Sequence, residues 1–289
     1  MKLALIAGTG ALPFVLFQHL SKLGEPPVVC AMRGFEPELK PNITFRIEHL
    51  GSFLHSLRED GVTHICMAGA MRRPDVNPAE IDALTAPLVP RLQEAMAKGD
   101  DGALRGIIAL LEEQGFTVIG AAELMPELLP EAGVLTKAVP QKGHQADAKV
   151  GDATLQQMGA ADSGQACVIR NGKVVRREGP EGTDMMMRVY AGAFAGGASL
   201  NPIRLFRVLM GLRKIFAPSR GAILFKAPKP GQDRRADLPV IGPDTAREAV
   251  AAKLDGIVIE DGGVMVLNLP EVRRILDAAG LFLWVRQWD

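Results

Sequence analysis

The sequence contains few of the residues on which several common classes of protein depend. Its 289 residues include three cysteines, Cys30, Cys66 and Cys167, and no CxxC pair, which excludes a disulfide framework and indicates a reducing compartment. The five histidines show neither HxxxH nor HExxH spacing, so a zinc site is not expected. Aromatic residues make up 5% of the chain, too few for a base-stacking platform.

Charge of one sign and long hydrophobic runs are also missing. The 33 basic and 33 acidic residues balance, so the chain has no general attraction for a polyanion and nucleic-acid binding is disfavoured. No apolar run approaches the ~18 residues of a membrane span. The opening MKLALIAGTG is shorter than a secretory signal and reads as a buried first strand. With 47% hydrophobic and 23% charged residues, the composition is that of a folded protein, which we expect in the cytoplasm.

The first part of the chain alternates short apolar segments with segments of helical spacing. This alternation predicts an α/β fold with a Rossmann-like parallel sheet in an N-terminal domain, residues 1–135. The predicted strands are Leu3–Ala7, Pro27–Met32, Thr63–Ala68 and Thr117–Ile119, and the predicted helices are Leu12–Leu23, Phe53–Asp60, Ala79–Lys98 and Leu104–Gln114.

The pattern changes after Met125–Gln145, a segment rich in proline that we take as the domain boundary. Asn171-Gly172 predicts a hairpin between two short strands, because a type I′ turn needs positive φ at both central residues. We therefore predict a distinct, mixed α/β C-terminal domain over residues 136–289. Its predicted elements are the strands Ala166–Arg170, Lys173–Arg177, Ala222–Lys226, Gly256–Ile259, Val264–Leu267 and Leu281–Val285, and helices from near Thr183, over Asp244–Leu254 and over Pro270–Ala279.

A glycine-rich turn follows the first predicted strand. Gly8 and Gly10 would let the backbone approach a phosphate, and the helix that begins near Leu12 would present free amides to an anion. A dinucleotide fingerprint would place a third glycine where Pro13 stands, and it would end the second strand with an acid that this chain lacks. The turn is thus either a nucleotide or phosphate cradle or a tight connection without a ligand.

Polar residues at other predicted element ends are further candidates for substrate binding. Arg72 follows the third predicted strand, where ligands of open α/β sheets bind. Arg72 and Arg73 could equally be a pair of solvated surface arginines. Asp100 and Asp101, beside Arg105 and between two predicted helices, serve as helix caps or bind a sugar hydroxyl, a uracil or a cation. Thr183 and Asp184 open a predicted helix, where they serve either as a helix cap or in substrate binding.

The loop after the strand Ala222–Lys226 holds the densest group of candidate residues. It combines cations, an amide and two carboxylates between prolines, a mixture that a solvated loop rarely needs. Magnesium takes one or two carboxylates together with phosphate oxygens, and the cations would offset phosphate charge. The predicted metal ligands are Asp233 and Asp237, the predicted catalytic residues are Lys226, Asp233 and Arg235, and the predicted substrate contacts are Lys229 and Gln232.

These motifs occur in an order that resembles a known family. Gly8-x-Gly10-x-Leu12-Pro13, Gly99-Asp100-Asp101, Glu181-Gly182-Thr183-Asp184, the block from Lys229 to Gly242 and Gly280-Leu281-Phe282-Leu283 resemble the LpxI-type UDP-2,3-diacylglucosamine pyrophosphatases over essentially the whole chain. The resemblance implies a Mg²⁺-dependent hydrolase of lipid A biosynthesis that yields UMP and 2,3-diacylglucosamine 1-phosphate (lipid X). It also implies water attack on the sugar-side phosphorus, a lipid held between two domains, and a homodimer.

One segment departs from the family pattern. Residues 200–220, LNPIRLFRVLMGLRKIFAPSR, contain no acid, and Arg204, Arg207 and Lys214 fall on one stripe at helical spacing. The segment is either a core helix with a basic solvent face or an amphipathic element that touches the anionic inner membrane. Other functions also stay open: a non-catalytic acyl-sugar carrier, an NAD(P)-dependent oxidoreductase, and a pyrophosphatase for another nucleotide sugar.

Overall fold

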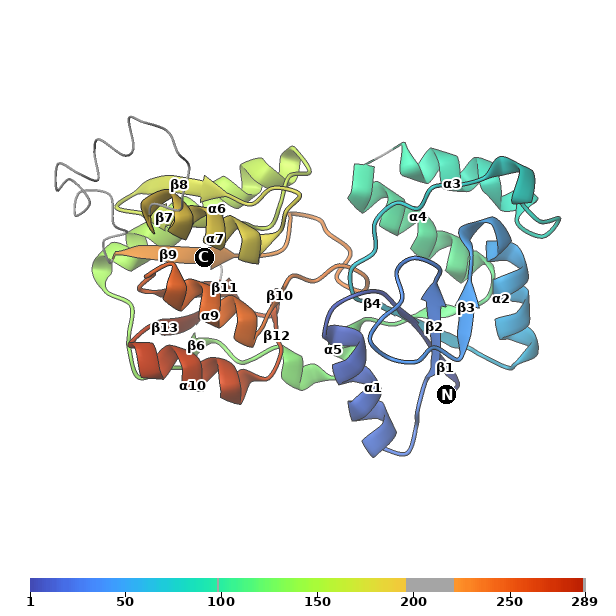
Figure 1. The fold of residues 1–289 in the computed structure, drawn as a ribbon, viewed down its shortest axis with the longest axis horizontal. Helices are drawn as coiled ribbons and strands as arrows, with labels where there is room; N and C mark the ends of the chain where they lie inside the picture. The colour runs from blue at the N-terminus through green and yellow to red at the C-terminus, as the bar shows by residue number, and fades with distance from the viewer. Residues whose placement is uncertain (98, 196–220, 288–289) are drawn as a thin grey trace. The chain divides into compact units, whose positions relative to one another are not determined.

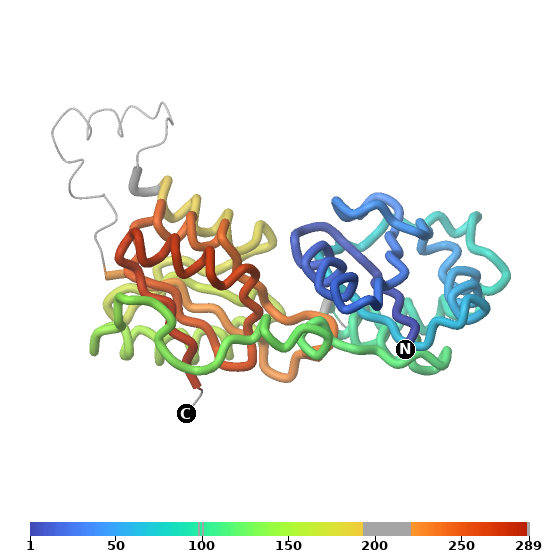
Figure 2. The backbone as a smooth tube through the Cα atoms, turned by 90° about the horizontal axis from the view of Figure 1, so that it is seen from below, coloured from blue at the N-terminus to red at the C-terminus, as the bar shows by residue number. Residues whose placement is uncertain are grey.

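The computed structural model describes residues 1–97, 99–195 and 221–287, which form two compact units. Unit 1 contains Met1–Leu128 together with Gln232–Leu238, and unit 2 contains Leu129–Gly231 and Pro239–Asp289. Figures 1 and 2 show the backbone of each unit. A short segment from the second half of the sequence is therefore part of the first unit.

Unit 1 is built on a five-stranded sheet in the order β3-β2-β1-β4-β5, and every neighbouring pair is parallel. Its strands are β1 (Leu3–Ala7), β2 (Val28–Met32), β3 (Ile43–Phe45), β4 (His64–Ala68) and β5 (Thr117–Val118). The predicted Rossmann-like sheet is confirmed. The sequence did not predict β3, because three residues are too few for a periodic pattern.

The helices of unit 1 follow the strands in alternation. They are α1 (Leu12–Lys22), α2 (Leu50–Glu59), α3 (Val89–Met96), α4 (Gly99–Glu113) and the short α5 (Ala121–Leu124), with single 3₁₀ turns at Ile47–His49, Pro78–Glu80, Ala86–Leu88 and Pro126–Leu128. Phe53 and Leu57 of α2 and Leu111 of α4 pack with Ile6 and Ile65 in one buried cluster. These two helices therefore cover one face of the sheet, and this packing fixes the position of α4 on the sheet.

The prediction of one helix over Ala79–Lys98 is wrong. The structure has two 3₁₀ turns before α3, which covers only Val89–Met96. Pro87 and Pro90 carry no amide hydrogen for a preceding helical turn, and the Asp82 carboxylate accepts the Thr85 amide at 2.6 Å in a local turn. The next helix, α4, begins at Gly99, so Asp100 and Asp101 lie in its first turn and not in a loop between helices.

Unit 2 is built on a six-stranded mixed sheet in the order β6-β13-β11-β9-β7-β8. Its strands are β6 (Gly133–Val134), β7 (Ala166–Arg170), β8 (Lys173–Arg177), β9 (Ala222–Lys226), β11 (Gly256–Glu260) and β13 (Phe282–Arg286). The central strands β9, β11 and β13 are parallel. At the edges, β6 pairs antiparallel with β13, β7 with β9, and β8 with β7. A separate parallel pair is formed by β10 (Val240–Ile241) and β12 (Met265–Val266). The predicted hairpin and mixed sheet are confirmed.

Helices cover both faces of this sheet. Neighbouring residues of a strand point to opposite faces, so Val168 packs with α7 (Thr183–Ala195), α9 (Pro243–Ala251) and α10 (Leu269–Ala279), whereas Ile169 packs with α6 (Lys142–Ala160). Figure 2 shows α7, α9 and α10 (yellow to red) on one side of the strands and α6 (yellow-green) on the other. The sheet is therefore the middle layer of unit 2.

Sequence periodicity did not predict α6, because its buried face carries polar residues. His144 accepts the Gln141 amide through Nδ1 at 3.0 Å, and its Nε2 lies 3.1 Å from Asp255. The Asp147 carboxylate accepts the amides of Asn171 and Gly172 at the tip of the β7–β8 hairpin, at 3.0 and 2.5 Å. These polar side chains hold the N-terminal end of α6 and the tip of the hairpin in place, and they give the sequence of a core helix the polar pattern of a linker.

Candidate functional site

The segment Gln232–Leu238 forms a closed turn within unit 1. The amides of Ala236 and Asp237 both donate to the carbonyl of Asp233, at 3.3 and 3.4 Å. The side-chain amide of Gln232, itself 8% exposed, donates to the Asp237 carboxylate. Ala236 packs against the apolar cluster of unit 1. The densest motif of the sequence is therefore an ordered turn seated on the first unit.

Asp233 is held by the arginine two residues after it. Its Oδ1 accepts from the backbone amide and from Nε of Arg235, both at 3.0 Å, and its Oδ2 accepts from Nη2 at 2.8 Å. The carboxylate side chain is 20% exposed. The hydrogen bonds from the Arg235 guanidinium lower the pKa of Asp233 below its ordinary value, and burial opposes them more weakly. Asp233 is therefore a partly exposed, ionised carboxylate near neutral pH.

Arg235 also ties this turn to helix α4. Its Nη1 donates to Glu112 at 2.6 Å, and its hydrogen bonds to Asp233 and Glu112 raise the pKa of the guanidinium further. Gly120 packs closely against Arg235: a Cβ on Gly120 would lie 3.2 Å from the Cα of Arg235. Arg235 thus links the carboxylates of Asp233 and Glu112. Its contact with a substrate phosphate stays a prediction from the sequence.

Helix α4 brings a second arginine to the same place. Arg105 donates to Asp101 through Nε at 2.9 Å, and this hydrogen bond raises the pKa of Arg105. The Arg105 charge also contributes to the lowered pKa of Asp233. We call Asp101, Arg105, Glu112, Asp233 and Arg235 the α4 charge cluster. The side chain of Asp100 is not among those that the structure describes.

The α4 charge cluster contains one residue that sequence reasoning missed. Glu112 lies seven residues after Arg105, and Arg105 lies four after Asp101, so all of them share one face of α4. The spacing alone could have placed Glu112 on the same face as the predicted site residue Asp101. The spacing could not show that the turn around Asp233 would dock there, because that contact spans more than a hundred residues of sequence.

In unit 2, the structure brings together two more of the predicted residues. The Lys226 ammonium donates to the Thr183 hydroxyl at 2.7 Å, and that hydroxyl donates to Glu178. Lys226 and Thr183 are each 7% exposed, so both lie in the interior. Asp184, the next residue of α7, accepts the Thr245 hydroxyl at 3.1 Å. Lys229 pairs with Asp162 at 2.6 Å.

The glycine turn after β1 is shaped by a neighbouring loop. Thr9 and Ala70 exchange backbone hydrogen bonds at 3.0 and 2.8 Å, which joins the loops after β1 and β4. A Cβ on Gly8 would lie 2.5 Å from the Ala70 carbonyl oxygen, so only glycine fits there. Packing alone therefore accounts for Gly8. The predicted contacts at Gly10 and Arg72 lie at the exposed carboxyl end of the sheet, whereas Leu12 is a buried residue in the first turn of α1.

The residues around Asp233 meet only part of the needs of a magnesium ion. Among the described residues, no group of three or more His, Cys, Asp or Glu side chains could hold a metal. The second predicted ligand, Asp237, accepts a hydrogen bond from Gln232. Magnesium is commonly held by one or two carboxylates, water and substrate phosphates, and an ionised Asp233 fits that donor set. A metal here would depend on the substrate for most of its ligands.

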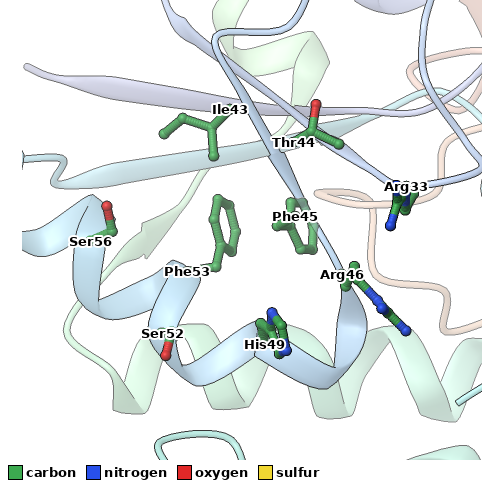
Figure 3. A pocket seen from close by; sticks show the side chains of 9 residues that line it. All are labelled: Arg33, Ile43, Thr44, Phe45, Arg46, His49, Ser52, Phe53 and Ser56. Carbon is green, nitrogen blue, oxygen red and sulfur yellow. The ribbon is translucent and has the colours of Figure 1, made fainter. Parts of the chain in front are cut away.

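A cavity lies elsewhere in unit 1, between β3 and α2. It has a volume of about 510 Å³, and its lining includes Phe45 and Phe53, whose rings stack with centroids 4.0 Å apart. Figure 3 shows these rings between Ile43 on one side and His49 and Arg46 on the other. Arg33 and Arg46 also line a smaller neighbouring cavity of about 250 Å³. None of the predicted site residues lines either cavity.

The cysteines take no part in the candidate site. All three are buried, and burial raises the pKa of each thiol to about 12. A thiol with such a pKa is not ionised near neutral pH and is a poor nucleophile. Cys30, Cys66 and Cys167 are therefore core residues.

Comparisons with known proteins agree with the two-part organisation. The sequence model of the LpxI N-terminal domain matches residues 2–128, and that of the LpxI C-terminal domain matches residues 131–284. The chain is 36% identical over 285 residues to a protein of Caulobacter vibrioides named UDP-2,3-diacylglucosamine pyrophosphatase LpxI, and the match covers 98% of this chain and 96% of that protein. The chain belongs to the LpxI family.

Proposed function

We propose that the protein is a hydrolase of lipid A biosynthesis that cleaves the pyrophosphate of UDP-2,3-diacylglucosamine to UMP and 2,3-diacylglucosamine 1-phosphate. The observation that carries the proposal is the match, over nearly the whole of both chains, to a relative whose name states this activity. The site adds chemical support: the most specific motif forms an ordered turn that presents an ionised carboxylate beside two arginines.

The reaction needs charge neutralisation and an oriented water more than it needs covalent catalysis. The oxygen of a water molecule bonds to the sugar-side phosphorus, the bond from that phosphorus to the bridging oxygen breaks, and UMP leaves with that oxygen. Asp233 would orient the water or accept its proton. Lys226, Lys229 and Arg235 would stabilise the charge that develops on the phosphates.

We propose magnesium as the cofactor, held by Asp233 and, as a second ligand, by Asp237. When bound, magnesium would polarise the phosphate oxygens and lower the pKa of a water. The remaining predicted residues would bind the uridine, sugar and phosphate groups: Gly8, Gly10, Leu12, Arg72, Asp100, Asp101, Thr183, Asp184 and Gln232.

The first test is release of UMP from the purified protein. We expect the wild type to hydrolyse UDP-2,3-diacylglucosamine with magnesium and to lose activity in EDTA. We expect Asp233→Ala to lower kcat by about a hundredfold or more, because it removes a charged group next to the reacting phosphates. Asp244→Ala is the matched control, since Asp244 is an exposed carboxylate that pairs with Arg247 in the same helix.

Each result decides a separate part of the proposal. Wild-type protein without UMP release would refute the hydrolase, and full activity in EDTA would refute the magnesium requirement. An Asp233→Ala variant as active as Asp244→Ala would refute the site. Non-acylated and acylated UDP-sugars, offered side by side, separate this activity from hydrolysis of another nucleotide sugar.

The place and assembly of the protein are also proposed. Among the described residues, no helix has the length and hydropathy to cross a membrane. We propose a cytoplasmic homodimer that touches the inner membrane transiently to collect its acylated substrate. The basic residues 200–220 that suggest this contact lie outside the described residues. Light scattering tests the dimer, and flotation with anionic liposomes, compared with Arg204/Arg207/Lys214→Glu, tests the membrane contact.

A further inference from the structure

A chain of hydrogen bonds in unit 2 leads from a backbone amide to the ammonium of Lys226. The Gln165 amide donates to Oε2 of Glu178 at 2.5 Å, the Thr183 hydroxyl donates to Oε1 of the same carboxylate, and Lys226 donates to the Thr183 hydroxyl oxygen at 2.7 Å. Sequence reasoning placed Lys226 and Thr183 in the site but assigned no role to Glu178.

The chemistry of these groups fixes the direction of each hydrogen bond. A lysine ammonium is only a donor, so the Thr183 oxygen must accept from it. The single proton of the hydroxyl is then directed to Glu178, whose ionised carboxylate is only an acceptor. Because the other carboxylate oxygen is occupied by the Gln165 amide, the Glu178 side chain is held at both of its oxygens.

The elements of unit 2 bring these residues to one end of the sheet. Gln165 precedes β7, Glu178 follows β8, and Lys226 is the last residue of β9. Ala166 pairs with Lys226 across β7 and β9, and the Glu178 amide donates to the Ala166 carbonyl at 2.9 Å. Thr183 begins helix α7, so the hydroxyl is carried by a rigid element. We call these hydrogen bonds from Gln165 through Glu178 and Thr183 to Lys226 the relay. The relay is anchored at the ends of strands and at the start of a helix.

We propose that Glu178, acting through Thr183, is a positioning residue that fixes the Lys226 ammonium for charge stabilisation at the substrate phosphates. This inference rests on the proposed function. A lysine is a point charge on a flexible four-carbon stem, so it stabilises a transition state fully only when its end is held before the reaction begins. The carboxylate one hydroxyl away supplies both the anchor and a compensating charge for a buried cation.

The substitutions that test the relay change little besides one polar group. Glu178→Gln keeps the shape but has one acceptor oxygen for the two donors, Gln165 and Thr183, that share the carboxylate. Thr183→Val removes the hydroxyl at nearly constant volume, and Thr183→Ser keeps the hydroxyl. Glu248→Gln is the matched control, because Glu248 pairs at 2.7 Å with Arg188, which also lies on α7.

We expect kcat to fall about tenfold or more in Glu178→Gln and Thr183→Val, with KM changed by less than about threefold, since the lost interaction acts mainly in the transition state. Thr183→Ser should stay within about threefold of the wild type and so rescue the Thr183→Val defect. Glu248→Gln should match the wild type. If Thr183→Val does not fold, Glu178→Gln and Thr183→Ser decide the question.

A measurement that does not depend on activity separates this inference from the proposed function. In ¹H–¹⁵N spectra of the full-length protein, the buried Lys226 ammonium should give a slowly exchanging signal that is absent from Lys226→Met. We expect the signal to persist in Thr183→Ser and Glu248→Gln and to disappear in Glu178→Gln. A signal unchanged in Glu178→Gln would overturn the relay, as would wild-type kcat in that variant while Lys226→Met is inactive.

Discussion

At the scale of single residues, this protein holds carboxylates with hydrogen bonds from backbone amides and from arginines. Asp233 is held by Arg235, and Glu48, in the 3₁₀ turn after β3, is held by the Asn77 amide at 2.9 Å and by Arg46 at 3.2 Å. Glu48 is 3% exposed, yet it lies outside the proposed site. A lowered carboxylate pKa in this fold is therefore not by itself the sign of a reacting group.

Replacement of Glu48 should make the protein less stable and less sensitive to acid. The hydrogen bond from the Asn77 amide is the main reason why the pKa of Glu48 falls from 4.5 to about 2. Because the folded chain favours the ionised form, this contribution to stability is complete above about pH 4.5 and is lost as the pH falls toward about 2. Glu48→Gln should cost about 1–3 kcal/mol of unfolding free energy at pH 7.

Urea unfolding at pH 7, 4.5 and 3 measures this effect. The loss caused by Glu48→Gln should shrink at pH 3, because there the unfolded wild type binds a proton at Glu48 that the folded chain largely does not. Glu113→Gln, which removes one member of an exposed pair with Arg91, is the control and should change stability by less than about 0.5 kcal/mol. An equal loss at all three pH values would show that the charge of Glu48 is not what stabilises this turn.

Residue types in the sequence indicate the chemistry of the site, but they do not indicate which residues pair. Asp233, Arg235 and Lys226 were all singled out from the sequence as groups for phosphate chemistry. Their partners Glu112 and Glu178 were not, because each contact depends on how separate elements pack. Asp101 and Arg105 are the exception, since a spacing of four residues on a helix places them together.

At the scale of elements, strands with continuous apolar runs were predicted accurately and helices with polar buried faces were not. β7 and β9 begin and end at the predicted residues, and so does β8, a polar strand that the Asn171-Gly172 turn indicates. Helix α6, by contrast, holds His144 and Asp147 in its buried face and lacks the usual apolar stripe. Its role is visible only in the structure, where Leu155 and Met158 pack with Phe225 on one face of the sheet.

The packing of α6 on the sheet depends on a glycine. A Cβ at Gly151 would lie 2.7 Å from Cδ1 of Phe225, a side chain on β9 that is 2% exposed. We expect Gly151→Ala to destabilise the protein by about 1–3 kcal/mol, because the ring has no space into which it can move. This loss opposes the helix propensity of alanine, which alone would favour the substitution by about 1 kcal/mol.

Gly143 in the same helix is the control for this prediction. A Cβ at Gly143 would have no neighbouring atom within 4 Å, so Gly143→Ala should leave stability unchanged or raise it by up to about 1 kcal/mol. Thermal and urea unfolding of both variants give the comparison. A Gly151→Ala variant as stable as Gly143→Ala would mean that α6 does not rest on Phe225.

At the scale of the whole molecule, one segment belongs to a different unit from the residues that flank it in the sequence. The chain leaves unit 2 after Gly231, contributes Gln232–Leu238 to unit 1, and returns at Pro239. Alternation of strands and helices along the sequence predicted both sheets, but it could not predict this exchange, because a segment of seven residues, six of them polar or small, carries no periodic pattern. The residue proposed for catalysis, Asp233, lies in the exchanged segment.

Membership of Gln232–Leu238 in unit 1 predicts which core stabilises this segment. Leu57 on α2 and Leu276 on α10 are both fully buried leucines on helices, one in the core of each unit. Substitution of either by alanine should cost about 2–5 kcal/mol in its own unit, because the cavity removes apolar contacts. Amide hydrogen exchange detects such local loss of stability along the chain. We therefore expect Leu57→Ala to speed exchange in residues 232–238.

Leu276→Ala supplies the comparison, because it weakens the core of unit 2 to a similar extent. It should speed exchange in β11 and β13 but leave residues 232–238 as they are in the wild type. The opposite pattern would show that the segment is stabilised by the flanking chain in unit 2. Faster exchange of the segment in both variants would show that the two units open together. If only Leu57→Ala acts, the Asp233 turn depends on the unit 1 core, including the face of α4 that carries Asp101, Arg105 and Glu112.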